Sequence, residues 1–432
     1  MRKKILLISV MMITLFLVVT LAQVGCAQAA GTESTETTVA PETTAAESTT
    51  VSETEATETT AVAGKTIKVG WLSYNISDDW FASVNEFGQQ EAKVIEQEEG
   101  VKFEFDIKDA GADAETQVKQ VDDLITVGDI DMLLFEAVDE KAMAKAITKV
   151  NEELNIPVGS AGTPAAGGKF IYVGLDNVKA TEQCGDYLAK LLNEKYGEPA
   201  KWGGDDGGII IEIWGPPGLQ ITKDRHTGFR NKIDPLLKQN PKVKIVEGTS
   251  NWNPDTAFKV ISDLVQRYGD EIIGIYTDDD TSATEGAWRA LELAGLAYPV
   301  GDPKHIPIVT YDGTMKGMQA VREKKIDMIT EQPAIAYGRI AMRYLYQWYK
   351  EGYESLPQPG TVLTLDDLSK YFDPETTGAK YWAPVEVLKG VNFDGIWFAP
   401  KSAIIPDELD PYEKNQWGNY NYFKKYGEYP TK

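Results

Sequence analysis

Polar and aromatic side chains gather in this sequence where predicted strands end and helices begin. The stretch NISDDWFASVNEFGQQEA (75–92) follows a short apolar run and places two adjacent aromatics, Trp80 and Phe81, in the first turn of a predicted helix. The preceding Asp78 and Asp79 have the chemistry of an N-cap, which accepts hydrogen bonds from free first-turn amides. A buried helix face accounts for Phe81. An indole at the mouth of such a loop either covers the helix start or faces a ligand.

Other predicted strand ends carry groups that could hold a polar guest. Taken singly, each has an ordinary explanation as a helix cap, a solvated cation or a backbone partner. Together they supply aromatic plates, carboxylates, an amide and a cation at loops that should share one edge of a parallel sheet. Sugars need such a set, because their rings have apolar faces and their hydroxyls both donate and accept. The candidate ligand-binding residues are Asp79, Trp80, Phe81, Lys223, Trp252, Asp279, Asp280, Asp312 and Gln332.

Motifs for catalysis or metal binding are weak in this sequence. It has two histidines, and neither stands at metal-ligand spacing from a cysteine or from the other. His305 is expected in a surface loop and His226 on a helix. No G-x-S-x-G elbow or G-x-G-x-x-G turn occurs, and GTPAAGGKF (162–170) is better explained as a glycine-rich turn than as a phosphate loop. We therefore predict no catalytic residue, no metal and no cofactor.

The N-terminus has the pattern of an export signal. Residues 1–25 begin with basic side chains and continue as a long uncharged apolar run, which is also just long enough for an uncleaved anchor. Cys26, after a small residue, resembles the lipidated cysteine of bacterial lipoproteins, although Gln23 stands where that pattern prefers an aliphatic residue. Cleavage within 27–29 (Ala-Gln-Ala) is the alternative.

Composition separates a tether from a folded body. Residues 31–64 contain twelve Thr, three Ser and seven Glu without Lys, Arg or an aromatic, which predicts a disordered tether over 26–64. The formal charge is −23; the first 64 residues account for −4 and the body for −19. An acidic body argues against nucleic acid as a partner. Beyond the signal only Cys184 remains, so no intrachain disulfide is expected if Cys26 is removed or lipidated.

Strand-like and helical patterns alternate through the body, which favours an α/β fold with parallel sheets covered on both faces. The units are too many for one small doubly wound sheet, so we expect two lobes. The predicted strands are 67–72, 103–107, 132–135, 156–160, 170–174, 209–214, 243–248, 272–277, 306–311 and 384–391. The predicted helices are 116–127, 140–154, 179–195, 255–268, 283–294 and 315–323, with a short helix within 362–372.

Several motifs in order make the body resemble the ribose-type periplasmic sugar-binding proteins of ABC importers, whose fold is similar to LacI-type effector domains. These motifs are SDDWFASVNEFGQQEA, NIPV, VGLDNVKATEQCGDYLAK, GPPGLQITKDRHTGF, YTDDDTSATEGAWRALELAG, YDGTMKGMQAV and EQPAIAYG. The resemblance implies two doubly wound lobes, 65–175 with 333–383 and 176–332 with 384–432, and three crossings near Leu175, Gln332 and 381–384. It also implies an aromatic pair at Trp80 and Phe81, a basic contact at Lys223, a second-lobe aromatic at Trp252, carboxylates at Asp279 and Asp312, and a hinge-side amide at Gln332.

One departure from that family bears on the guest. After NIPV, the family's ribose binders carry an Asp-Arg pair, whereas this chain reads GSAGTP (159–164), with Ser160 and Thr163 as weak substitutes. The sequence therefore admits as the guest, in place of ribose, another pentose, a hexose, a polyol, a cyclitol or a larger saccharide. The implied protein is a monomeric, membrane-anchored, extracytoplasmic receptor serving an ABC permease. The alternatives are a sensor partner of a chemoreceptor or histidine kinase, a binder of a non-sugar solute and, third, an extracellular enzyme.

Overall fold

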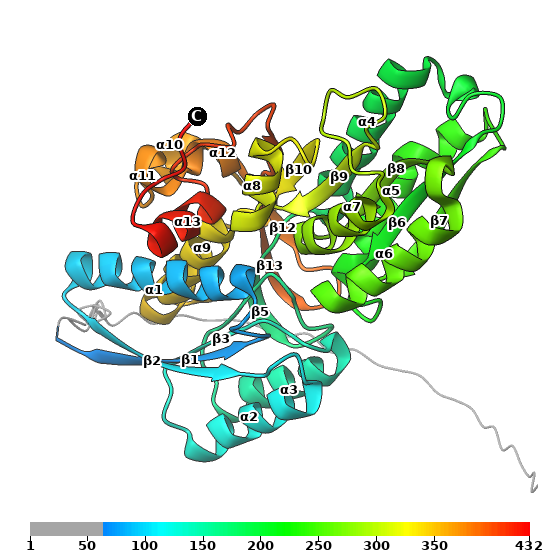
Figure 1. The fold of residues 1–432 in the computed structure, drawn as a ribbon. Coiled ribbons are helices and arrows are strands. Elements are labelled where there is room, and N and C mark those ends of the chain that lie inside the picture. Colours follow the sequence, from blue (N-terminus) through cyan, green and yellow to red (C-terminus); the bar gives the residue numbers. More distant parts are fainter. Residues whose placement is uncertain (1–63) are drawn as a thin grey trace, which may run out of the picture. The chain divides into compact units, whose positions relative to one another are not determined.

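The computed structural model describes residues 64–432. The expected export signal (1–25), the lipidation candidate Cys26 and nearly all of the expected tether lie outside this range. Within it, no helix combines the length and the apolar character that crossing a bilayer requires. The described chain forms two sheets, each with helices on both faces (Figure 1).

The first sheet has eight strands in the order β11-β12-β13-β5-β4-β3-β1-β2. Six of them run parallel, while β12 pairs antiparallel with β13 and β11 antiparallel with β12. The strands are β1 (Thr66–Ser73), β2 (Lys102–Asp109), β3 (Met132–Phe135), β4 (Val158–Ala161), β5 (Lys169–Val173), β11 (Val362–Leu363), β12 (Val385–Lys389) and β13 (Asp394–Pro400).

Helices cover this sheet on both faces because its central strands are apolar on both sides. Trp71 of β1 points to one core, together with α1 and α9, and its neighbour Leu72 points to the other, with α2 and α3. Figure 1 shows these helix pairs on opposite faces. Asp78 caps α1 by accepting from the Trp80 and Phe81 amides. The helices are α1 (Asp79–Glu99), α2 (Ala114–Val127), α3 (Glu140–Glu153) and α9 (Ala334–Glu351), followed by the short α10 (Leu365–Leu368), α11 (Pro374–Thr377) and α12 (Ala379–Trp382).

The second sheet has six strands in the order β14-β10-β9-β8-β6-β7, all parallel except β14. Alternation along β6 again serves two cores: Ile209, Ile211 and Ile213 face one, and Ile210 faces the other. The strands are β6 (Gly208–Trp214), β7 (Val243–Thr249), β8 (Ile272–Thr277), β9 (Ile308–Asp312), β10 (Met328–Glu331) and β14 (Ile404–Ile405).

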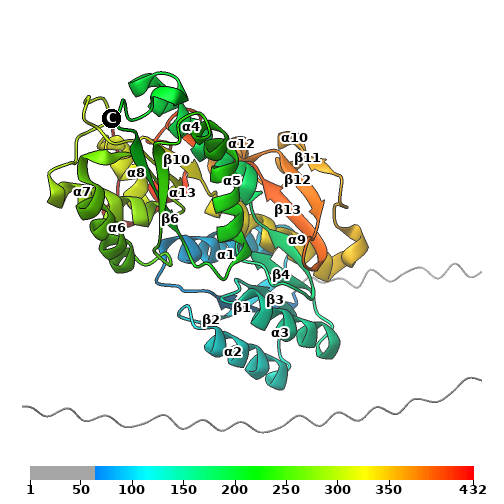
Figure 2. The same ribbon diagram turned by 90° about the vertical axis from the view of Figure 1, so that its right-hand side faces the viewer.

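Helices cover both faces of the second sheet, and Figure 2 shows α5 (Gln220–Leu237) and α6 (Pro254–Tyr268) on opposite sides of β6. Cys184 lies on α4 (Asn177–Tyr196) and is fully buried against the sheet, with its Sγ 3.4 Å from the Thr310 carbonyl oxygen. The helices of this lobe are α4 (Asn177–Tyr196), α5 (Gln220–Leu237), α6 (Pro254–Tyr268), a π-helical segment (Ser282–Trp288) that continues into α7 (Arg289–Ala294), α8 (Met315–Arg322) and, near the C-terminus, α13 (Trp417–Tyr426).

The chain crosses between the sheets three times, and the third crossing differs from the expectation. The first two follow β5 and β10, near Leu175 and Gln332 as predicted. The expected crossing at 381–384 is wrong, because β12 and β13 (385–400) both belong to the first sheet. A short turn joins these strands as an antiparallel hairpin, and β13 continues the parallel ladder beside β5. The chain crosses between Pro400 and Ile404 instead, so only 404–432 enters the second lobe.

Candidate ligand-binding site

A cavity of about 670 Å³ lies between the two lobes, where the carboxyl ends of strands from both sheets meet. Its walls come from the loops after β1 and β4 on one side and after β7, β8 and β9 on the other, as expected for parallel sheets. Seven of the nine predicted ligand-binding residues line it: Asp79, Trp80, Phe81, Trp252, Asp279, Asp312 and Gln332. Their contact with a guest stays a prediction.

Trp80 forms the floor of the first-lobe wall and is itself well packed. Its side chain is 6% exposed and meets Phe81 and Tyr337 edge-to-face, with ring centroids 5.0 and 5.1 Å apart. Its Nε1 donates to the Gln332 carbonyl oxygen at 3.3 Å. Gly162 has φ +100° and passes under the indole so closely that a Cβ there would lie 2.5 Å from the ring. The indole therefore serves the fold as well as the cavity.

Trp252 lies on the opposite wall and is more accessible. Its side chain is half-buried, and its backbone φ of 55° is in the left-handed region, which is uncommon for a bulky residue. Tyr74, after β1, stacks on Phe81 at 4.7 Å and reaches the Trp252 ring at 6.1 Å. Sequence reasoning missed Tyr74. The two lobes thus approach each other through aromatic rings beside the cavity.

Arg225, and not the predicted Lys223, brings a cation to the second-lobe wall of the cavity. Lys223 is exposed and does not line the cavity, whereas Arg225 lines it at 3% exposure. A spacing of four residues puts Ile221, Arg225 and Phe229 on the inward face of α5, and Lys223 points elsewhere. That apolar spacing is the signal from which Arg225 could have been predicted.

The guanidinium of Arg225 is fixed by three parts of the chain. Its Nε donates to Asn177 Oδ1 at 3.1 Å, its Nη1 to the Asp278 carbonyl oxygen at 2.7 Å and its Nη2 to Gln332 Oε1 at 2.8 Å. Its Cζ also lies 3.9 Å from the Tyr311 ring centroid. Burial lowers the pKa of Arg225, but nearby Tyr311 and carboxylates outweigh that effect and raise it. Since a guanidinium has five N–H donors, two stay available for a guest.

Asp280 does not line the cavity, so its predicted ligand role is not supported by its position. Its carboxylate accepts from the amides of Gly313 and Thr314 at 3.0 and 2.7 Å, and from the Thr314 hydroxyl at 2.7 Å. These bonds turn the side chain toward the loop after β9 and away from the cavity. Asp280 therefore holds the loop that presents Asp312.

Three carboxyl groups of the cavity, those of Asp78, Asp279 and Asp312, have raised pKa values. Burial raises the pKa of Asp312 well above its usual range, although Arg225 opposes the shift, and burial also raises the pKa of Asp279. Burial raises the pKa of Asp78, beneath the first-lobe wall, to about 6. Asp312 has φ +115°, a strained backbone of the kind that clusters at functional sites. A carboxyl group that keeps its proton can donate to a hydroxyl as well as accept from one.

Thr163, in the segment that replaces the family's charged pair, carries a buried hydroxyl with an unmet hydrogen-bonding need. Its Oγ1 has no partner within residues 64–432 and its side chain is 1% exposed, yet it lines the cavity. Ser160 is occupied, since its Oγ donates to the Thr163 carbonyl oxygen at 3.0 Å. A buried hydroxyl beside a cavity calls for a partner from a guest or from water.

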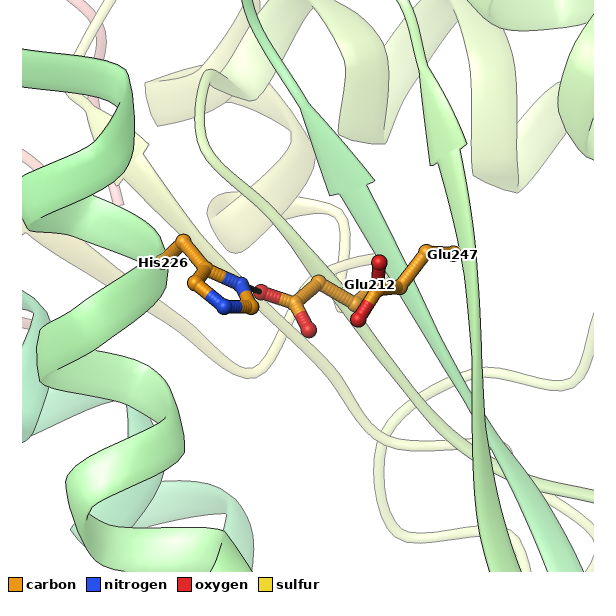
Figure 3. A group of neighbouring side chains, drawn as sticks. All are labelled: Glu212, His226 and Glu247. Atoms are coloured by element: carbon orange, nitrogen blue, oxygen red, sulfur yellow. Dashed lines mark hydrogen bonds and ion pairs between the residues drawn. The ribbon is translucent and has the colours of Figure 1, made fainter. Parts of the chain in front are cut away.

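A second polar group lies away from this cavity and is an ion-pair network. His226 Nδ1 lies 2.8 Å from Glu212 Oε1, and Glu247 stands close by, as Figure 3 shows. Arg230 already supplies the positive charge: its Nη1 lies 2.8 Å from Glu247 Oε1 and 3.4 Å from Glu212 Oε2, and its Nε donates to Asp234. His226 lies on α5, as predicted.

His305 is buried, which corrects the expectation of a surface loop residue. At 6% exposure it contacts the Tyr298 carbonyl oxygen through Nδ1 at 2.6 Å and Asp327 Oδ2 through Nε2 at 2.8 Å. Asp327 also accepts from the Ile308 amide at 2.7 Å. His305 thus joins the start of β9 to the turn before β10.

Comparison with known proteins places these features in one family. Residues 69–352 match the model of the periplasmic binding protein domain. The chain is 26% identical over 278 residues to a ribose import binding protein of Bacillus subtilis, covering 64% of this chain and 80% of that protein. It is 27% identical over 213 residues to a fructose import binding protein of Bifidobacterium longum, covering 47% of this chain and 57% of that protein.

Solved structures share the fold. A Caulobacter myo-inositol binding protein bound to myo-inositol matches with a TM-score of 0.55 and 22% identity, covering 66% of this chain and 88% of that one. The two-lobed α/β architecture and the family match agree. The chain therefore belongs to the periplasmic binding protein domain family, among relatives that include sugar import binding proteins.

Proposed function

We propose that this protein captures a neutral polyhydroxylated solute, a sugar or a polyol, between its two lobes and delivers it to an ABC permease. The observation that carries this proposal is the composition of the cavity. Aromatic rings of both lobes stand beside a fixed guanidinium, protonatable carboxyls and an amide in one space of about 670 Å³. The names of the relatives, which import ribose and fructose, support the same class of guest.

Each wall has a separate part in binding such a solute. Trp252 and the edge of Trp80 offer apolar surface to the C–H faces of a ring. Arg225, Asp312 and Gln332 offer directed hydrogen bonds to hydroxyls, and those that involve a charge are the stronger ones. Micromolar capture requires about 8 kcal/mol. A few such bonds and one stacked ring account for it in a cleft that excludes water.

The wall after β4 favours a guest other than ribose. The segment 159–164 offers Ser160 and Thr163 where the resembling ribose binders carry a charged pair. Of these two hydroxyls, that of Thr163 has no hydrogen-bond partner within residues 64–432. A hexose, a cyclitol or a polyol, with more hydroxyls and more bulk, makes better use of this wall. Lobe closure about the three crossings would then enclose the guest.

The N-terminal features fit the same role. We infer that residues 1–25 direct export, that Cys26 carries a lipid and that 26–64 is a tether holding the two lobes outside the membrane, within reach of the permease. Replacing Cys26 by Ser and following the protein in membrane and soluble fractions tests the anchor. The lipid-bound chain is expected in the membrane fraction and the variant in the soluble one; an unchanged distribution contradicts lipidation.

Thermal-shift and calorimetric titration of the purified protein test the function. The panel contains ribose, fructose, allose, xylitol and myo-inositol, with an amino acid and a nucleoside as solutes of other classes. We expect at least one neutral polyhydroxylated compound to raise the melting temperature and to bind at micromolar concentration or below. A response to the amino acid or nucleoside alone contradicts the proposed guest. Lys223→Ala is the matched control, because that side chain lies outside the cavity.

A further inference from the structure

The C-terminal part of the chain closes one side of the cavity although it lies beyond the family match, which ends at residue 352. Helix α13 (Trp417–Tyr426) is its last element, and Figure 1 shows it beside both α1 and α8. Three of its residues line the cavity: Asn421, Lys424 and Lys425. The site therefore has a third wall in addition to those of the two lobes.

The start of α13 is firmly attached to the second lobe. Gln416 Nε2 donates to the Gly313 carbonyl oxygen at 2.6 Å, and Arg322 of α8 donates to Asn419 Oδ1 at 2.7 Å. Trp417 and Asn419 are fully buried. A Cβ on Gly418 would lie 2.4 Å from the Gly313 carbonyl oxygen, so glycine is needed for this close approach. Gly313 follows Asp312, which joins the helix to the loop of a candidate ligand-binding residue.

The outer face of α13 meets α1 of the first lobe through half-buried and exposed side chains, and the Tyr420 ring packs on Phe87 with centroids 5.4 Å apart. Asn421 Nδ2 donates to Ser83 Oγ at 2.8 Å, and the Tyr420 hydroxyl bridges Glu86 at 3.2 Å and Gln90 at 3.0 Å. Lys424 pairs with Glu86. These partners lie one helical turn apart on a single stripe of α1. Tyr420 and Asn421 are half-buried and Lys424 is exposed.

The difference between the two sides determines which contacts give way. Separating α13 from α8 and from the loop after β9 would break the buried hydrogen bonds of Gln416 and Asn419. Separating it from α1 would break accessible polar contacts and the packing of the half-buried Tyr420 ring on Phe87. The segment just before α13 is joined to α11 and α12 by two contacts: Glu413 with Tyr381, and Asn415 with the Glu375 carbonyl oxygen. The amide of Lys401, at the third crossing, donates to the carbonyl oxygen of Trp382 in α12 at 2.9 Å. Of the contacts of α13 with α1, those of Asn421 with Ser83 and of Lys424 with Glu86 join residues that line the cavity.

We propose that α13 is a latch helix: it moves with the second lobe, engages α1 when the lobes close over a guest, and turns Asn421 toward that guest. This inference rests on the proposed function and assigns to it a specificity-determining element that the matched domain does not contain. The latch slows release, because its contacts with α1 must break before the cavity opens. It also sets the space available to substituents at the mouth.

Release kinetics test the latch helix. Using the panel compound with the largest thermal shift, stopped-flow tryptophan fluorescence of Tyr420→Ala should show dissociation about tenfold faster than the parent protein, with little change in association. Asn421→Ala should alter the rank order of affinities across the panel. Tyr426→Ala is the control, since Tyr426 lies on the same helix at 52% exposure and its ring lies beside Tyr422 and Lys425 of that helix and not beside α1. Unchanged release from Tyr420→Ala in a protein that binds sugar contradicts the latch alone.

Crosslinking tests the movement without knowledge of the guest. In a Cys26→Ser background, Glu86→Cys with Lys424→Cys is treated with a short bis-maleimide. Asp186→Cys with Lys232→Cys, whose native side chains form a 3.0 Å ion pair within the second lobe, is the control. The sugar-free latch pair should crosslink slowly but fully, and bound sugar should accelerate it without affecting the control. Immediate crosslinking of the latch pair with and without sugar overturns the latch, and so does the absence of any crosslinking. If no sugar in the panel binds, slow but complete crosslinking of the latch pair still supports the movement.

Discussion

The two main walls of the cavity are built on different principles. The first-lobe wall consists of rings that belong to the core: Trp80 and Phe81 are 6% and 5% exposed and pack on Tyr74 and Tyr337. The second-lobe wall combines the accessible ring of Trp252 with polar groups, led by Arg225, that are held by bonds to strand ends and to neighbouring side chains. The first wall is therefore coupled to folding stability, and the second to recognition. Substitutions on each wall should separate these two effects.

The largest effect is expected at Arg225. Arg225→Ala removes the cation that Asp278, Asp312 and Gln332 surround, and truncating one partner of a buried charged network costs about 2–5 kcal/mol. Sugar affinity should fall at least about 100-fold, as measured by calorimetry. Arg225→Lys should recover only part of the affinity, because it keeps the charge but loses the planar fork. Affinity equally reduced in Lys223→Ala would contradict the assignment.

The two tryptophans should respond in opposite ways. Trp80→Ala leaves a hole in the first-lobe core, so the free energy of unfolding in urea should drop by about 3–5 kcal/mol. Trp252→Ala should leave that free energy nearly unchanged but weaken sugar binding about tenfold, consistent with an aromatic contact of about 0.5–1.5 kcal/mol. Equal loss of stability in both variants would mean that Trp252 also serves the core.

The smallest effect concerns pH and the second-lobe wall. Burial raises the pKa of Asp278 to about 7, above the unfolded value of about 3.9, so the folded state binds more protons between these values. Its contribution to stability therefore decreases as pH rises from about 4 to 7. Asp278 Oδ1 is buried without a partner, and Asn can imitate the neutral form. Asp278→Asn should give a shallower decline of unfolding free energy from pH 5 to 8; an unchanged slope would contradict the shift.

Much of the framework follows from sequence, because apolar runs and strand-to-helix loops specify parallel sheets. The predicted strands 67–72 and 272–277 lie within β1 and β8, and the strand-end rule brings Trp80, Trp252 and Asp312 to one cavity. The choice between Arg225 and Lys223 as the cation of the cavity failed because it requires knowing which face of α5 points inward. Three consecutive aspartates likewise left open which side chain turns to the loop and which to the cavity.

The C-terminal region was harder to predict for a different physical reason. Its elements are short and polar, and they acquire structure from partners distant in sequence. Strand β13 (394–400) is defined by its pairing with β5, and α13 is defined by its contacts with α8 and with the loop after β9, neither of which a local period reveals. The third crossing was misplaced for the same reason. Long-range pairing, rather than local propensity, determines this part of the chain.

Cys184 allows unfolding of the second lobe to be measured through the alkylation rate of its buried thiol. Its sulfur lies between α4 and the sheet at 0% exposure, and burial raises the pKa of the thiol to about 12. Oxidants and alkylating reagents therefore do not meet a reactive thiolate in the folded lobe. Lobe closure leaves α4 on its sheet, and only detachment of that helix uncovers the sulfur. The alkylation rate of this thiol in the Cys26→Ser protein thus reports unfolding of the second lobe separately from movement between lobes.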